Sequence, residues 1–176
     1  MDPENRSFDV IGQLGALRRY ARSLVRDSAE AEDLVHDALV RAYDRRITFK
    51  KGANLRTWLL SIVHNTHIDR IRGALARRRR DDAAVLEAEL SYSGNQEHAV
   101  RLRQVQQAFM ALPEDQREAL HLIAVEDLSY QEAADALGVP VGTLMSRVSR
   151  ARATLRALEA EGKHASHLRV VGGGDD

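Results

Sequence analysis

The sequence contains no cysteine, which excludes disulfide bonds and thiolate metal sites and fits a reducing compartment. Only 5% of its residues are aromatic and only three are proline, while Ala, Leu, Arg and Glu are abundant, a composition that favours helices over sheets. No apolar run approaches the roughly 20 residues of a membrane span, and the first residues lack the apolar core of a signal peptide. We therefore expect an all-α, cytoplasmic protein that does not associate with membranes.

The chain also has no net charge, with 26 basic and 26 acidic residues, which on its own argues against a nucleic-acid-binding protein. The charges are nevertheless segregated, and fields in salt solution act over about 10 Å, so local blocks matter more than the total. Residues 70–80 and 136–158 contain arginines and no acid, whereas residues 81–100 contain acids and neither Lys nor Arg. Any one block is compatible with a solvated helix face, but two basic blocks flanking an acidic one favour contact with nucleic acid.

At 176 residues the chain suits two small domains of roughly 70 residues each better than one. Apolar positions recur at helical spacing in both halves, and between them lies an acidic segment that ends in turn-like residues. We predict a first domain over residues 8–80, a flexible linker over 81–97, a second domain over 98–162 and a disordered tail over 163–176.

Capping residues mark two helix starts in the first domain. Asp27 precedes an acidic first turn, and Asn54 ends a polar loop before the next apolar pattern. Trp58 lies on the apolar face of that second helix, so we interpret it as core rather than as a wedge that melts DNA. His64 and His67 are three apart on the same helix, but no carboxylate or thiol cluster completes a metal site, so we predict no metal.

The second domain contains a short helix, a glycine turn and a new helix. Ser129 and Glu132 have the spacing of a capping box, and Gly138 can adopt the positive φ that a tight turn requires. Pro140 stands where a helix begins, and Leu144 and Val148 then point inward. Such a pattern predicts a helix-turn-helix.

An ordinary helical hairpin would not explain the outer face of the last helix. Ser146, Arg147, Ser149, Arg150 and Arg152 gather there without an acid, and free amides at its start favour a phosphate. We therefore predict that this helix recognises DNA.

Motifs of both halves match one family in order and spacing. In the second half they are Leu112-Pro113, Arg117–Leu120, Leu128–Ala134, Gly138–Arg147 and Arg150–Arg152, and in the first half Ala31–Asp37, Asn54–Leu60, Ile62–Thr66 and Asp69-Arg70. The second half thus resembles the −35-binding domain 4, and the first half domain 2, of the extracytoplasmic-function (ECF) sigma factors of bacterial RNA polymerase, in the sigma-70 family. The resemblance covers most of residues 10–158, and the domain 3 of larger sigma factors is missing.

The resemblance implies an alternative sigma factor that binds core RNA polymerase and promoter DNA and is controlled by an anti-sigma factor. Its implied docking residues are Asp33, Leu34 and Asp37, although Leu34 fits the core equally well. The implied −10 residues are Phe49, Lys50, Asn54, Asn65 and Arg70, which supply a stacking surface, base-edge amides and cations for an extruded base. The implied −35 residues are Gly142, Thr143, Met145, Ser146, Arg147, Ser149, Arg150 and Arg152. The acidic linker either threads the RNA channel of polymerase or is a plain tether.

Other classes of function fit less well. The sequence shows no nucleophile paired with a base and no phosphate-binding glycine loop, so we predict no enzyme, no cofactor and no small-molecule substrate. A stand-alone helix-turn-helix regulator remains the alternative, and an adaptor that binds only proteins would leave the basic face of residues 145–156 unexplained.

Overall fold

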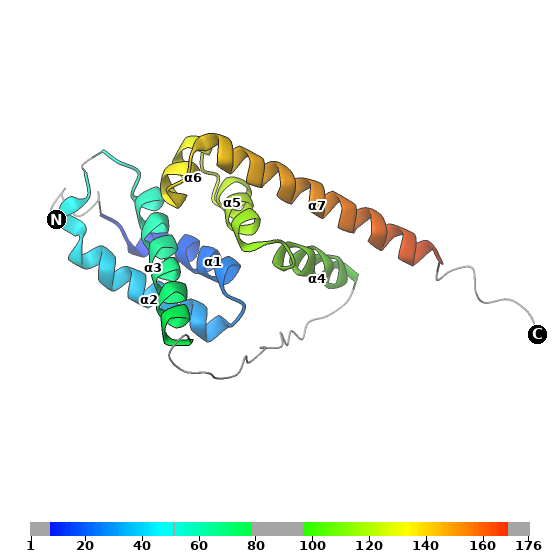
Figure 1. The fold of residues 1–176 in the computed structure, drawn as a ribbon, viewed down its shortest axis with the longest axis horizontal. Helices are drawn as coiled ribbons and strands as arrows, with labels where there is room; N and C mark the ends of the chain where they lie inside the picture. The colour runs from blue at the N-terminus through cyan, green and yellow to red at the C-terminus, as the bar shows by residue number, and fades with distance from the viewer. Residues whose placement is uncertain (1–7, 51, 79–96, 169–176) are drawn as a thin grey trace, which may run out of the picture.

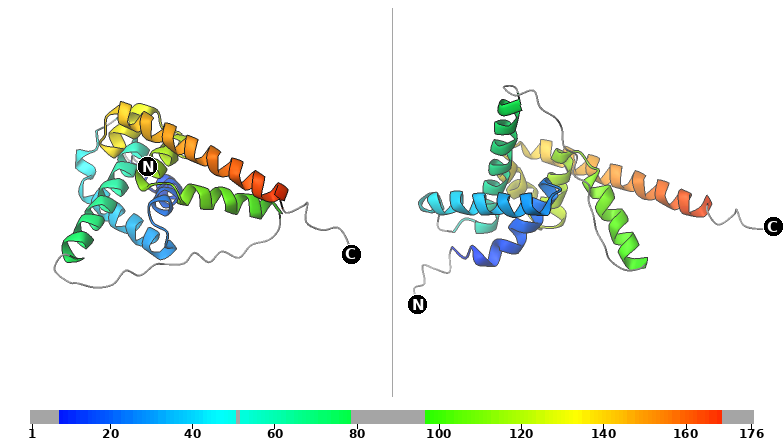
Figure 2. Two further views of the ribbon diagram at one scale, coloured as in Figure 1. Left: turned by 45° about the vertical axis from the view of Figure 1, so that its right-hand side comes forward. Right: turned by 90° about the horizontal axis from the view of Figure 1, so that it is seen from below.

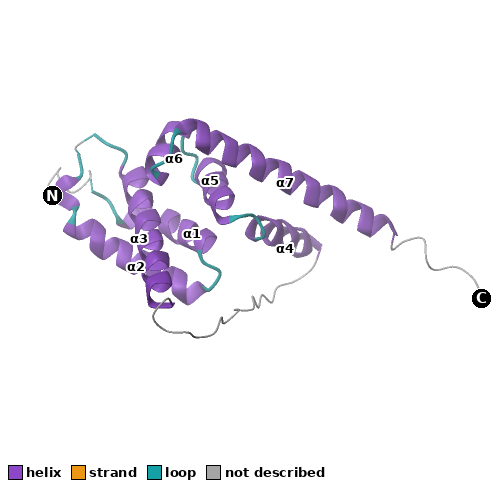
Figure 3. Cartoon of the chain, in the orientation of Figure 1, coloured by secondary structure: helices purple, strands orange, loops and turns teal. Residues whose placement is uncertain are grey.

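The computed structural model describes residues 8–50, 52–78 and 97–168, and within these ranges the protein is helical with no strand. The described ranges contain seven α-helices, whose arrangement Figures 1 and 3 show. They are α1 (Leu14–Leu24), α2 (Ser28–Asp44), α3 (Leu55–Arg78), α4 (Glu97–Met110), α5 (Glu114–Ala124), α6 (Tyr130–Leu137) and α7 (Val141–Leu168), with short 3₁₀ turns at Ile11–Gln13 and Arg46–Thr48. The predicted all-α class is confirmed.

The first domain consists of α1, α2 and α3, and both predicted helix caps are present. The Asp27 carboxylate accepts a hydrogen bond from the Glu30 amide at 2.8 Å, and the Asn54 side chain accepts one from the Thr57 amide at 3.3 Å. Trp58 packs against the core and contacts the Phe49 ring, with 5.3 Å between ring centroids, so its interpretation as a packing residue is confirmed.

The second domain consists of α4 to α7 and contains the predicted helix-turn-helix. The Ser129 hydroxyl and the Glu132 carboxylate form the reciprocal capping box that starts α6, and Gly138 ends this helix with φ 64°. The last helix begins directly after Pro140, and Leu144 and Val148 are buried as predicted. These local signals succeed because each involves groups only a few residues apart.

One expectation about the second domain was wrong. Helical spacing in the sequence predicts that Ala124 points inward, but it is exposed at the end of α5, and Leu122 is fully buried instead. The last helix is described as far as Leu168, and the predicted tail begins within it at Lys163. The predicted linker, apart from Glu97, and residues 169–176 lie outside the described residues.

The two domains pack against one another rather than standing apart. The first domain's α3 lies beside α6, and α1 lies beside α5, while α4 and the distal part of α7 extend away from the body (Figures 1 and 2). Buried residues of both domains belong to one continuous hydrophobic cluster. The two halves that the sequence distinguishes therefore share an apolar contact in this structure.

Candidate nucleic-acid interface

The first turns of α7 present one apolar and one polar side. Leu144, Val148 and Ala151 are buried against the rest of the second domain. The residues predicted to read DNA lie on the remaining surface and are exposed, namely Gly142, Thr143, Met145, Ser146, Ser149, Arg150 and Arg152. Such a face, without an acid, suits a polyanion in a groove wide enough to admit a helix.

Arg147 differs from its predicted companions. Its side chain is 22% exposed, and its guanidinium lies 3.4 Å from the Asp115 carboxylate and 3.8 Å from the Glu118 carboxylate of α5. The contact joins α7 to α5 and orients the recognition helix. No local spacing in the sequence indicates this pairing, because the partners are about thirty residues apart.

The predicted −10 residues are spread along the loop before α3 and along α3 itself. The Phe49 ring contacts the Trp58 ring in a tilted arrangement, while Lys50 and Asn65 are exposed. Arg70 is half-buried and forms an ion pair with Asp37 of α2. The hydrogen bond from Arg70 lowers the pKa of Asp37 below its ordinary value, against the opposing effect of burial. The structure thus couples one predicted −10 residue to one predicted docking residue.

Asn54 contacts the second domain. Its amide nitrogen donates to the Glu132 carboxylate at 2.9 Å. The residue that caps α3 is therefore bonded to the residue that forms the capping box of α6 with Ser129. Backbone and side-chain hydrogen bonds from Ser129, followed by the one from Asn54, hold the pKa of Glu132 below its usual range. A cleft of about 420 Å³ lies here, lined by Ala53, Asn54, Thr57, Trp58, Ser61, Glu132, Asp135 and Ala136.

The predicted docking residues lie on α2. Asp33 and Asp37 are exposed four residues apart on one face, and Val40, 50% exposed, continues that face three residues later. Val40 was not among the predicted docking residues. Its position off the apolar face of the helix could have indicated that it is exposed. Leu34 is fully buried, which agrees with the alternative that it belongs to the core.

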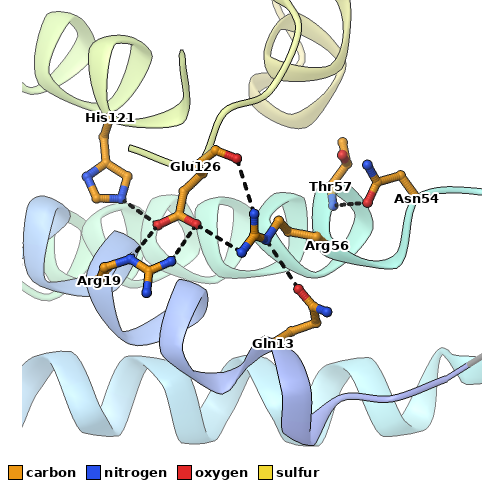
Figure 4. A network of polar contacts seen from close by, with 7 residues as sticks. All are labelled: Gln13, Arg19, Asn54, Arg56, Thr57, His121 and Glu126. Atoms are coloured by element: carbon orange, nitrogen blue, oxygen red, sulfur yellow. Dashed lines mark hydrogen bonds and ion pairs between the residues drawn. The ribbon is translucent and has the colours of Figure 1, made fainter. Parts of the chain in front are cut away.

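A buried carboxylate joins the two domains where the chain leaves α5 (Figure 4). Glu126 is 1% exposed, and its two oxygens accept hydrogen bonds from the Arg19 guanidinium of α1, both at 3.0 Å. His121 lies 3.3 Å from the same carboxylate, and Arg56 of α3 lies 3.8 Å from it while also donating to the Glu126 carbonyl at 3.3 Å. Sequence reasoning missed this network, because Arg19 and Glu126 are 107 positions apart.

Burial raises the pKa of Glu126, but hydrogen bonds from His121 and Arg19, with their charges, outweigh it and hold the pKa below the ordinary value. The group is therefore a carboxylate at neutral pH. A buried charge is tolerated only when its partners satisfy it, so the contact depends on Arg19 and Arg56 staying in place.

Both histidines that were considered as metal ligands face glutamates of α5 instead. His64 Nδ1 lies 3.1 Å from Glu118, and His67 Nε2 lies 2.7 Å from Glu114. Within the described ranges, no group of three or more His, Cys, Asp or Glu side chains is arranged to hold a metal ion. Across the same ranges, none of the helices combines the length and the apolar character that crossing a membrane requires.

Comparison with known proteins gives matches over both domains. Residues 12–79 match the family model of Sigma-70 region 2, and residues 102–155 match that of Sigma-70 region 4. The ECF RNA polymerase sigma factor EcfG of Rhodopseudomonas palustris is 36% identical over 154 residues, which span 85% of this chain and 82% of that protein. The ECF sigma factor SigM of Mycobacterium tuberculosis is 35% identical over 142 residues, spanning 81% of this chain and 70% of that protein.

Two solved structures have the same arrangement of helices. The sigma factor RpoE of Bartonella quintana, solved with the anti-sigma factor NepR, superposes with a TM-score of 0.77 at 34% identity, over 89% of this chain and 98% of that one. CnrH, solved with the cytosolic domain of CnrY, gives a TM-score of 0.63 at 27% identity, over 89% of this chain and 90% of that one.

Both regions occur in the order that the motifs predicted, which confirms the resemblance and disfavours a stand-alone regulator. The chain belongs to the ECF family of RNA polymerase sigma factors.

Proposed function

We propose that this alternative sigma factor binds core RNA polymerase and reads promoters through two separate surfaces, one on each domain. The observation that carries the proposal is the exposed outer face of α7, where Arg150 and Arg152 stand in a segment without acids, opposite a buried apolar face. Sigma factors act in transcription initiation without catalysing the chemistry themselves, so we assign no enzyme activity. Because the polymerase and its template are cytoplasmic in bacteria, we place the site of action there.

The −35 element is assigned to the first turns of α7. Arg150 is our candidate for base readout, because its planar fork can pair with guanine O6 and N7 in the major groove. Arg152 is assigned to a backbone phosphate of the DNA. Arg147, which also contacts Asp115 of α5, is likewise assigned to a phosphate. The other proposed contacts on this surface are Gly142, Thr143, Met145, Ser146 and Ser149.

The −10 element is assigned to α3 and the loop before it, which we call the −10 surface; it consists of Phe49, Lys50, Asn54, Asn65 and Arg70. An extruded base needs an aromatic platform, an edge reader and a nearby cation, and these residues supply all three. The aromatic cluster of Phe8, Phe49 and Trp58 supports the platform role, and exposure of Asn65 supports the edge-reader role.

Polymerase docking is assigned to the face of α2 that carries Asp33, Asp37 and Val40. Two acids beside an exposed apolar side chain suit a basic, partly apolar partner helix. Leu34 then acts from beneath, by holding α2 on the core. The acidic linker remains either a channel-threading segment or a tether.

Control by an anti-sigma factor is proposed from similarity. RpoE of Bartonella quintana was solved with the anti-sigma factor NepR, and the superposition with this chain covers 98% of the length of that sigma factor. We propose that a protein of the same class binds this chain and withholds it from polymerase.

A DNA-binding comparison tests the proposed function. We expect the purified chain to bind promoter DNA specifically only together with core polymerase. The Asp33→Arg, Asp37→Arg double variant should lose core polymerase in co-purification, whereas Asp44→Arg, exposed at the end of the same helix, should keep it. Specific duplex binding by the chain alone would instead indicate a stand-alone regulator.

A further inference from the structure

The contact between the domains uses polar groups of the −10 surface and its surroundings. Glu132 of the second domain accepts the Asn54 amide, and Glu126 accepts Arg19 and approaches Arg56. Arg56 is two residues from Asn54 at the start of α3. Carboxylates of the second domain therefore hold the Asn54 end of the surface that we assign to promoter DNA.

The geometry at Glu126 is that of an arginine binding an oxyanion. Two parallel hydrogen bonds of 3.0 Å from one guanidinium to two oxygens form the fork by which arginine also grips phosphate. The Glu126 side chain is fully buried, so water does not reach its carboxylate, while the Arg19 side chain is half exposed. One carboxylate thereby attracts two cations of the first domain, Arg19 and Arg56.

This closed arrangement cannot contact both promoter elements at once. Positions −35 and −10 are about 25 base pairs apart, which at 3.4 Å each is about 85 Å of straight duplex. Here Asn54 is hydrogen-bonded to α6 of the helix-turn-helix, and the whole of α7 is only about 42 Å long at 1.5 Å per residue. The domains must separate before both elements are read.

The covalent chain permits that separation. Eighteen residues lie between Arg78, the end of α3, and Glu97, the start of α4. A chain of this length spans at most about 60 Å when fully extended. The constraint that keeps the domains together is thus the non-covalent contact between them.

We propose that Glu126 is a latch that holds the free sigma factor closed, with Asn54 of the −10 surface bonded to Glu132 of the second domain, and that loading onto polymerase releases it. Glu126 is suited to this role because one buried carboxylate ties α1 and α3 to the chain that leads into the helix-turn-helix. Contacts of His64 with Glu118 and of Arg117 with the Ser23 carbonyl add to the same interface. The proposal rests on the proposed function, which defines the −10 surface.

Distance measurements between two spin labels test the latch directly. Because the chain has no cysteine, Ala29→Cys on α2 and Thr154→Cys on α7, both exposed, place one label on each domain. We expect the full chain to give one short, narrow distance. Glu126→Gln should raise the ratio of separated to closed molecules about tenfold or more, because the charge that binds both arginines is lost.

Two further variants complete the test. Arg19→Gln, whose side chain is half exposed, should open the chain as well and decides the matter should Glu126→Gln lose helical content. Glu159→Gln, exposed on α7, is the matched control and should leave the short distance unchanged. Parent-like distances in a folded Glu126→Gln variant and in Arg19→Gln, or a parent chain that is already separated, would overturn the latch.

Adding core polymerase to the labelled parent chain distinguishes a failure of the latch from a failure of the proposed function. We expect the short distance to be replaced by a long one in the complex. Persistence of the short distance in the complex would overturn the proposed release. A chain that fails to bind core polymerase at all would overturn the proposed function, while the free-chain distances of the variants would still decide whether Glu126 holds the domains together.

Discussion

Arg117 offers a quantitative prediction about stability. Its side chain is 6% exposed, and its guanidinium donates to three carbonyl groups, those of Ser23, Met110 and Leu112. Ser23 lies in the last turn of α1 and Met110 ends α4, so one cation serves the carbonyl ends of two helices. Burial lowers the pKa of Arg117, but the guanidinium remains charged at neutral pH.

The expected cost of Arg117→Ala follows from these bonds. A hydrogen bond to a charged group contributes about 1.5–3 kcal/mol, and three of them set an upper bound. Water reaches part of the site once the side chain is removed, so we expect a loss of about 3–5 kcal/mol in the free energy of unfolding. Arg117→Lys keeps the charge but cannot span three carbonyls with one ammonium group, so about 1–3 kcal/mol is expected.

Urea unfolding of the full chain, followed by circular dichroism, measures these values. Arg152→Ala, an arginine exposed on α7, is the control and should change the free energy of unfolding by less than about 0.5 kcal/mol. A loss below about 1 kcal/mol for Arg117→Ala, or equal losses for the alanine and lysine variants, would refute the assignment of the three carbonyl bonds.

Three further predictions concern the caps, the buried acid and the recognition helix. Ser129→Ala removes the N-cap of α6 and should lower the free energy of unfolding by about 1 kcal/mol in the same urea assay. Because the pKa of Glu126 is lowered in the folded protein, the contribution of this carboxylate to the free energy of unfolding is present at neutral pH and is lost as the pH falls through that lowered value. Thermal unfolding scans below about pH 5 should therefore show the parent losing stability more steeply with acid than Glu126→Gln. Arg150→Ala should weaken holoenzyme binding to the preferred −35 sequence by about 1–3 kcal/mol in competition binding, whereas Arg156→Ala, exposed further along α7, should not change that preference.

The sequence predicts the local parts of this structure well. The capping box at Ser129, the cap at Asn54, the turn at Gly138 and the inward positions of Leu144 and Val148 depend on residues three or four positions apart. For the same reason the exposed face of α7 could be derived before the fold was known. The apolar and basic side chains of that region can be assigned to opposite faces from helical periodicity alone.

The contacts between domains could not be predicted in this way. Glu126 lies just before a recognisable motif, but nothing near it indicates Arg19 as its partner. Likewise the sequence gives no reason to place Glu118 opposite His64. The sequence also does not indicate that Arg147, a proposed phosphate contact, is paired with Asp115 and Glu118 of α5. Each of these pairings depends on tertiary packing, which charge and periodicity along the chain do not encode.

Mapping transcript 5′ ends from core polymerase supplemented with this chain tests the central claim most directly. The parent should add start sites preceded by a shared pair of elements near −35 and −10. Arg150→Ala should relax only the first element, and Asn65→Ala only the second, because the two residues stand on different domains. Start sites identical with and without the chain would contradict its assignment as a promoter-directing subunit. Loss of both elements in either variant would contradict the division of promoter reading between α3 and α7.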